Sequence, residues 1–248
     1  MMVMTRNHFW QKRKIFLSLT TITKGGWEKK IKEIQKFGLE EICLFLTCVG
    51  EKERRAVYRQ LEKTSVRKIP LVHLRNDMKP EELAYLIKRF KTEAFNAHSA
   101  REYPFLTNLS RYQKRIYLEN TKIPLVEDEI KEFAGVCLDF VHLEIDRIWR
   151  PGKYKQDIEV AKKFLCGCNH LSAMKEALYR EGPEAVSHHY LSDVSDLDYL
   201  KHYPANFFSP ICALELENSL EEQMEARDYL FQLLKDKNDE EQENGIIK

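Results

Sequence analysis

The feature of this sequence that most limits its fold is a series of short apolar runs, each ending in an acidic residue or a histidine. Six such runs occur between residues 67 and 217, and most are separated by segments with helical spacing. The carboxyl ends of parallel strands surround a single mouth when an α/β sheet closes into a barrel. We therefore expect the terminal polar residues to converge there: His73, His98, Glu119, Asp139, His170 and Glu215.

Strand and helix signals alternate along the whole chain. We expect strands at residues 14–21, 41–49, 67–74, 94–98, 115–119, 136–142, 166–171 and 211–217. Helices are expected at 26–37, 51–63, from 80 onward, 125–133, 155–165 and 219–234. Eight units in the chain give about 31 residues each, which is the pitch of a strand–helix module in a closed barrel. The sequence predicts an α/β fold, a single (β/α)8 TIM barrel over residues 1–248. An open doubly wound sheet fits less well, because no glycine-rich turn follows the first strand.

The last helix has a clear start signal, and two segments stand outside the alternation. Ser219 followed by Glu222 forms a capping-box pattern. The charged tail, 236–248, is expected to be frayed. The long stretch 173–210 lies between the last two strands, where extended loops of barrels commonly hold substrate.

Composition excludes some partners. The chain has 40 basic and 39 acidic residues and a net charge of +1, so no overall field attracts it to nucleic acid. DNA is therefore a less expected partner than a small molecule. No apolar run approaches the length of a membrane span. Most of the six cysteines fall in expected strands, as in a cytoplasmic protein with reduced core thiols.

Taken singly, each strand-end residue has an ordinary explanation. A lone histidine there is often only hydrogen-bonded, and Asp139 in Asp139-x-x-His142 could simply cap the following turn. Glu119 follows the buried pattern Ile-Tyr-Leu, and a glutamate is seldom left unpaired inside a protein. The coincidence over six strands instead indicates a shared site. Imidazole and carboxylate ligands together suit a divalent ion such as zinc or manganese.

Four segments carry a resemblance to a known family. They are Leu118-Glu119-Asn120-Thr121, Leu138-Asp139-Phe140-Val141-His142, Asn169-His170-Leu171-Ser172 and Ala213-Leu214-Glu215. The second half of the chain thereby resembles the xylose isomerase-like TIM barrels, which include sugar phosphate isomerases and epimerases and the endonuclease IV type of AP endonuclease. The resemblance implies that Glu119, Asp139, His170 and Glu215 hold a metal ion. Glu217 is an alternative to Glu215 because it lies on the same strand face.

The resemblance also implies roles for four further histidines. His142 would contact the substrate, as in the isomerases, or bind an additional metal, as in the endonucleases. His73 and His98 match extra ligands of the endonuclease branch. His188 matches the histidine of an Asp-x-His pair in that branch, but Val186 occupies the aspartate position. The expected cofactor is therefore one to three divalent ions.

The function expected first is a metal-dependent sugar or sugar-phosphate isomerase or epimerase acting on a small carbohydrate-like substrate. Glu119 and Glu215 would transfer protons and His142 would orient a substrate oxygen, while the ion stabilises an enediolate. One alternative is an endonuclease IV-like zinc phosphodiesterase that acts on abasic DNA. A third is a barrel that binds metal or sugar without turnover, which the loss of an acid at Val186 leaves open.

Overall fold

The computed structural model describes residues 13–22 and 26–243, with side chains as far as residue 235. Strands and helices alternate through most of the chain. The strands are β1 (Lys14–Phe16), β2 (Ser18–Thr20), β3 (Cys43–Phe45), β4 (Leu71–His73), β5 (Ala94–Ala97), β6 (Ile116–Glu119), β7 (Gly135–Asp139), β8 (Cys166–Leu171) and β9 (Ile211–Leu214). The helices are α1 (Trp27–Phe37), α2 (Glu51–Leu61), α3 (Pro80–Phe90), α4 (Glu127–Ile130), α5 (Phe140–Trp149), α6 (Pro151–Ala161), α7 (Glu176–Glu181) and α8 (Leu220–Glu243). Within the described residues there are also three 3-10 helices: η3 (Ser110–Arg115), η4 (Val194–His202) and η5 (Ala205–Phe207).

All strand pairs are parallel, and the sheet closes on itself. The strand order is β1-β9-β8-β7-β6-β5-β4-β3-β2. β1 and β2 are separated only by Leu17, so they form one interrupted strand with β9 on one side and β3 on the other. The carbonyl of Leu17 accepts a hydrogen bond of 2.9 Å from Cys43 N, which continues the pairing with β3. The chain is an α/β barrel with eight strand positions, as predicted.

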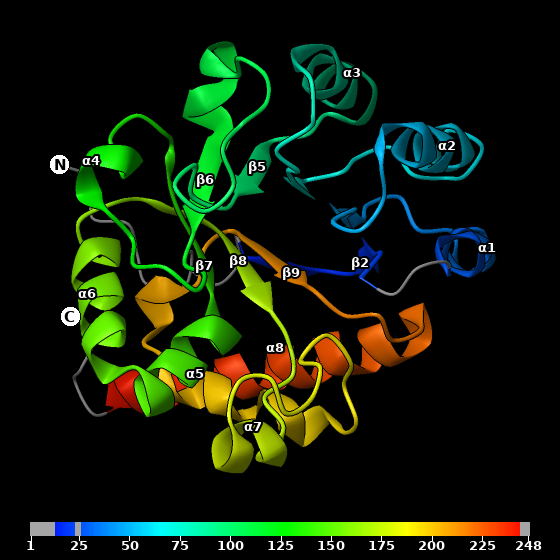
Figure 1. Cartoon of the computed structure of the whole chain (residues 1–248). Coiled ribbons are helices and arrows are strands. Elements are labelled where there is room, and N and C mark those ends of the chain that lie inside the picture. The colour runs from blue at the N-terminus through cyan, green and yellow to red at the C-terminus, as the bar shows by residue number, and fades with distance from the viewer. Residues whose placement is uncertain (1–12, 23–25, 244–248) are drawn as a thin grey trace, which may run out of the picture.

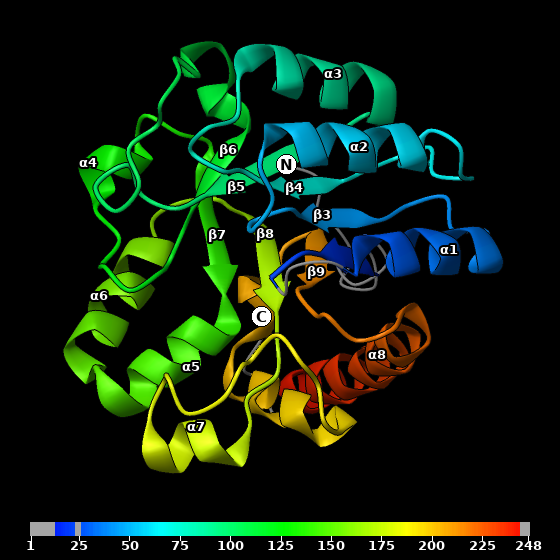
Figure 2. The same cartoon turned by 45° about the vertical axis from the view of Figure 1, so that its right-hand side comes forward.

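The helices surround the strands in Figures 1 and 2. Their amphipathic sequences explain this arrangement, since α1, for example, buries Trp27, Ile31 and Ile34 and exposes its charged face. A larger apolar core fills the space between strands and helices. A second cluster includes Phe16, Cys43, Phe45, Cys137 and Cys168, which lie on β1, β3, β7 and β8. Among the described residues no helix is long and apolar enough to cross a membrane.

Several element boundaries differ from the sequence prediction. The strand expected at 136–142 ends at Asp139, and His142 lies on α5, because the Asp139 side chain accepts a hydrogen bond from His142 N and caps that helix. α6 begins earlier than expected, at Pro151, a residue that favours the first helical turn. The stretch 173–210 contains α7, η4 and η5.

The start of the last helix agrees with its sequence signal. Glu222 Oε2 accepts from Ser219 N at 2.8 Å, and Ser219 Oγ accepts from Glu222 N at 3.3 Å, which confirms the capping box. α8 continues to Glu243, so much of the tail expected to be frayed has a helical backbone. Residues 244–248 of that tail lie outside the described part of the chain.

Candidate metal centre

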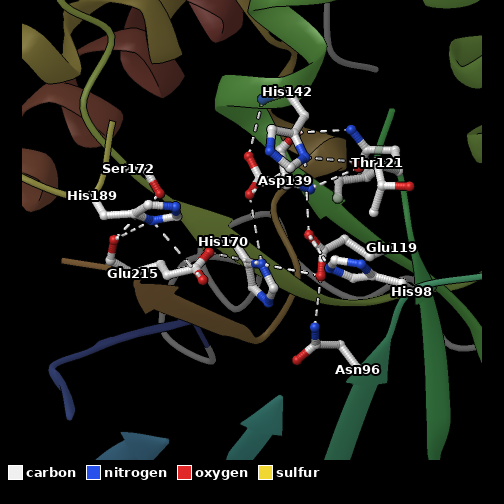
Figure 3. Close-up of polar contacts among 12 residues, drawn as sticks. Asn96, His98, Glu119, Thr121, Asp139, His142, His170, Ser172, His189 and Glu215 are labelled. Atoms are coloured by element: carbon white, nitrogen blue, oxygen red, sulfur yellow. Dashed lines mark hydrogen bonds and ion pairs between the residues drawn. The ribbon is translucent and has the colours of Figure 1, made fainter. Parts of the chain in front are cut away.

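The carboxylate of Glu119, at the end of β6, is the point on which the strand-end side chains converge (Figure 3). Its Oε2 atom lies 3.2 Å from Nε2 of His73 and 3.5 Å from Nδ1 of His170. Its Oε1 atom lies 3.9 Å from Nε2 of His98 and 3.9 Å from Nδ1 of His142. Four of the expected histidines, from β4, the end of β5, β8 and α5, therefore surround a single carboxylate.

His170 is a second centre of contacts and is fully buried at the end of β8. Its Nδ1 atom lies 3.7 Å from Asp139 Oδ2 and 3.3 Å from Glu215 Oε2, in addition to Glu119. Asp139 ends β7, and Glu215 directly follows β9. The four residues expected to hold a metal ion thus face one another at the carboxyl ends of four adjacent strands.

The side chains form two potential ligand groups that share Glu119. His73, His98 and Glu119 make up one group, and Glu119, Asp139 and His170 make up the other. Within each group the donor atoms lie within 4.8 Å of one another. Two donors bound to one tetrahedral ion at about 2.0–2.2 Å are separated by roughly 3.3–3.6 Å. The distances around His170 therefore match the spacing that a shared cation requires.

The electrostatics of the cluster favour a cation. Glu119, Asp139 and Glu215 are each at most 5% exposed. Burial would raise their pKa values, but the neighbouring histidines lower the pKa of Glu119 well below its ordinary value and that of Asp139 to about 2. The pKa of Glu215 is lowered for the same reason, with His189 and His170 opposing burial. Glu119 and Glu215 outweigh the burial of His170 and raise its pKa well above the ordinary value, so a protonated imidazole balances these carboxylates where a divalent ion would otherwise do so.

Buried donor atoms without hydrogen bonds support the same conclusion. Within the described residues, Asp139 Oδ2 and both ring nitrogens of His170 are buried and make no hydrogen bond. Buried polar groups are nearly always hydrogen-bonded unless they bind a metal, a water or a ligand. The residues present therefore fit a divalent metal centre, and the mixed histidine and carboxylate donors suit zinc, with manganese as the alternative.

Neighbouring polar groups orient the donors. Asn96 Nδ2 donates to Glu119 Oε2 at 2.7 Å, and the Asn120 side chain pairs with the backbone of Asp139 through two hydrogen bonds. His73 Nδ1 lies 3.0 Å from the carbonyl of Leu74, and that contact directs Nε2 toward Glu119. Outer hydrogen bonds of this kind fix ring orientation and increase metal affinity in known sites.

The remaining predicted residues border these two groups. His142 Nδ1 is held at 3.0 Å by the carbonyl of Asn120, and the ring is about one-quarter exposed. His188 packs with ring centroids 5.5 Å from His142 and 3.9 Å from His189. Burial and the two neighbouring histidines lower the pKa of His188 to about 3, so its ring is neutral at pH 7. Val186 is exposed and supplies no donor beside it.

Two polar residues of the centre, His189 and Asn96, were not expected from the sequence. His189 places Nδ1 4.0 Å from Glu215 Oε1, and Asn96 contacts Glu119 directly. Asn96 lies two residues before His98, so the twofold period of a strand could have placed both on one face. His189 gave no such signal, because it lies between α7 and η4, outside the regular elements.

No protein-family model and no curated protein matches this sequence. Solved structures that resemble the chain include endonuclease IV from Thermus thermophilus, at 16% identity and a TM-score of 0.48. That match covers 88% of this chain and 99% of the other. N-acetylneuraminate lyase from Mycoplasma synoviae is similar at 13% identity and a TM-score of 0.43, over 93% of this chain and 81% of the other. Neither similarity bears on the chemistry of the centre.

Proposed function

We propose that this protein is a metal-dependent hydrolase of phosphoesters, in which two ligand groups that share Glu119 would each hold a divalent ion. The observation on which this rests is that Glu119 belongs to both ligand groups. Centres with two neighbouring ions are typical of phosphatases, nucleases and aminopeptidases, where they supply Lewis acidity to both sides of a displacement. From the sequence we expected an isomerase or epimerase first and a phosphodiesterase as the alternative. We reverse that order because the distances of His73 and His98 from Glu119 favour a second ion.

An arginine beside the centre favours an anionic substrate. Arg75 lines a cavity that His73 and His98 also line. Its guanidinium is fixed by Asp77, with Nε 3.0 Å from Oδ1, and by the carbonyl of Thr47. A planar guanidinium of fixed orientation suits phosphate oxygens. This arrangement favours a phosphoester over an amide.

The residues of the chain have separable roles in this proposal. Six side chains at the mouth of the barrel would bind the divalent ions: Glu119, Asp139, Glu215, His73, His98 and His170. Asn96 and Asn120 keep Glu119 and Asp139 in place. His142 is partly exposed and its Nδ1 is held by Asn120, so its other nitrogen can hold a proton next to the reacting ester.

A sugar or sugar-phosphate isomerase is the second candidate, and one observation favours it. Oxygens of Glu119 and Glu215 lie 3.5 Å and 3.3 Å from the same atom, Nδ1 of His170. Two ionised carboxylates around one ion can move a proton between neighbouring carbons. Glu119, Asp139, His170 and Glu215 would then hold a single ion, and His73 and His98 would not be ligands.

Metal counting and a substrate panel together test the proposal. Purified protein is loaded with zinc or manganese, freed of excess ion and analysed for metal per chain. It is then offered bis(p-nitrophenyl) phosphate, an abasic DNA duplex at low salt and a set of sugar phosphates. We expect two ions per chain and ester hydrolysis that is lost in Glu119→Gln.

The other outcomes separate the alternatives. One ion per chain with interconversion of a sugar phosphate would favour the isomerase. Incision of the duplex without hydrolysis of the small ester would make the protein a DNA enzyme. Two bound ions with no turnover of any substrate would contradict the hydrolase and favour a barrel that only binds metal.

A further inference from the structure

We propose that the cavity beside His73 and His98 binds a flat aromatic ring, so that the substrate is a phosphoester of a nucleoside or a similar aromatic alcohol. This inference rests on the proposed phosphoester hydrolysis and adds the class of substrate. The cavity has a volume of about 360 Å³ and is formed by residues at or after the ends of β3, β4 and β5. A space of that size accepts one ring-bearing group.

Aromatic side chains form one wall of the cavity. Tyr103 is 51% exposed, and its ring centroid lies 5.2 Å from that of His98. Phe105 also lines the cavity, and its ring packs 6.2 Å from that of Phe133. An exposed ring in a cavity wall offers an unused face, and stacking on such a face contributes strongly to the binding of nucleobases. The wall therefore favours a flat partner.

Polar groups at the edge of the cavity match the edge of a heteroaromatic ring. Asn76 donates its Nδ2 to the carbonyl of Pro104 at 3.3 Å, and its Oδ1 takes no hydrogen bond within the described residues. Arg75 uses Nε and one terminal nitrogen on Asp77 and Thr47. Its second terminal nitrogen has no such partner in the described part of the chain. That nitrogen is the donor proposed above for phosphate, so Asn76 Oδ1 is the polar atom left for the edge of the ring.

The wall is held in place before any ligand binds. The segment 99–109 is attached to the segment after β4 by three hydrogen bonds. Leu106 N donates to the carbonyl of Asn76 at 2.9 Å, Asn76 Nδ2 donates to Pro104, and Thr107 Oγ1 donates to the carbonyl of Met78 at 2.7 Å. A pocket that is already formed loses little entropy on binding.

The cavity also has the correct position relative to the metal centre. His73 and His98 line it and at the same time face Glu119. An ester at the centre can therefore place its ring in the cavity without further movement. The aromatic ring would therefore belong to the part of the substrate that does not react.

Binding measurements test the inference without relying on turnover. Zinc-loaded protein is titrated by calorimetry with thymidine 5′-monophosphate, ribose 5-phosphate and methyl phosphate, which share a phosphate but differ in the group attached. We expect the nucleotide to bind at least about 10-fold more tightly than the other two, which corresponds to one stacked base. Equal affinities, or a preference for the sugar phosphate, would overturn the inference.

Variants of Tyr103 test whether its ring causes the tighter binding of the nucleotide. Tyr103→Phe should keep it, whereas Tyr103→Ala and Tyr103→Leu should remove it, because leucine preserves bulk but offers no aromatic face. Tyr190→Ala is the matched control, since Tyr190 is 49% exposed and is not among the residues that line the cavity. Metal content is measured for each variant. If Tyr103→Ala retains both its zinc and the nucleotide preference, the aromatic wall is not the binding surface.

A chromogenic pair separates this inference from the proposed function. The substrates are the p-nitrophenyl ester of thymidine 5′-monophosphate and methyl p-nitrophenyl phosphate, which have the same leaving group. Hydrolysis of both at equal kcat/KM would leave the hydrolase intact and overturn the ring site. Selective nucleotide binding without hydrolysis of either ester would support the ring site and overturn the proposed hydrolase.

Discussion

At the scale of single residues, Glu119 is the side chain with the largest expected effect on the centre. Both of its oxygens face histidines, and Asn96 fixes the carboxylate through a hydrogen bond of 2.7 Å. Asp139 and Glu215 contact His170 but belong to one side of the cluster. Removing the shared carboxylate should therefore affect both ions, whereas removing Asp139 should affect one.

We predict that Glu119→Gln binds both ions at least about 100-fold more weakly, because the loss of a ligand exceeds the 10–100-fold effect of losing an outer partner. Asp139→Asn should retain one ion of the two. Elemental analysis after dialysis against buffers of defined free zinc concentration measures the zinc bound by each variant. Glu217→Gln is the control and should keep two ions, since Glu215 is the acid that contacts His170. Loss of an ion in that control would instead make Glu217 a ligand.

The ligand positions were predictable from the sequence to the extent that strand ends are predictable. His73, Glu119 and His170 lie within strands whose apolar character is obvious, and a parallel barrel brings such ends together. The element from which each side chain reaches the centre was harder to predict from the sequence. His142 reaches the centre from α5 rather than from a strand, because Asp139 ends β7 and caps that helix. His189 depends on the path of an irregular segment, which short-range sequence patterns do not encode.

At the scale of elements, a buried ion network joins α2 to α3. Arg54 on α2 is fully buried and contacts Glu82 on α3 through Nε at 2.7 Å and Nη2 at 3.0 Å. Tyr58 also donates to Glu82, at 2.8 Å. Both helices cover the strands that supply the cavity and His73. Both helices were expected from the sequence, but the network was not, because charged positions on a helix usually face solvent.

We predict that Arg54→Met lowers the free energy of unfolding by about 3–5 kcal/mol, because it leaves Glu82 buried and without its counter-ion. Urea denaturation monitored by circular dichroism measures the change. The double variant Arg54→Met/Glu82→Leu should recover part of the loss, since it removes both charges together. An equal or larger loss in the double variant would show that apolar packing around Arg54, rather than the unpaired charge, dominates.

The loop between β4 and α3 should respond to acid through Asp77. Burial would raise the pKa of Asp77, but Arg54 and Arg75 lower it below its ordinary value. A depressed carboxylate pKa stabilises the folded state above the unfolded pKa of about 3.9, and this contribution is lost as pH falls through the folded value.

Asp77→Asn should therefore reduce stability at pH 7 by about 1 kcal/mol, a modest value because the side chain is partly exposed to solvent. The difference from the wild type should shrink below about pH 4. Unfolding midpoints measured between pH 3 and pH 8 check the profile, and Glu132→Gln serves as a control on an exposed acid. A difference that does not vary with pH would assign the role of Asp77 to packing.

At the scale of the whole molecule, the barrel is closed by a strand that pairs on both sides. The candidate metal centre lies where six strands end or have just ended. β1 and β2 join β9 to β3 across Leu17. The ligand groups and Glu215 come from β4, β5, β6, β7, β8 and β9 or the residues directly after them. The closed fold could be predicted from alternation and length, but its break at Leu17 could not, because Leu17 continues the apolar run Ile15-Phe16-Leu17 without a turn signal.

Metal binding should consequently stabilise the entire barrel rather than one loop. An ion that binds only the folded state adds about 2.7 kcal/mol when its free concentration is 100 times its Kd. For a chain of this length that gain should raise Tm by about 5–10 °C. Scanning calorimetry with buffered zinc and with a chelator measures the shift.

Glu119→Gln, which disrupts both ligand groups, should show almost none of this shift in Tm, while Glu217→Gln should retain it. A zinc-dependent rise of the same size in Glu119→Gln would mean that the stabilising ion binds elsewhere on the chain, and the proposed centre would then be wrong.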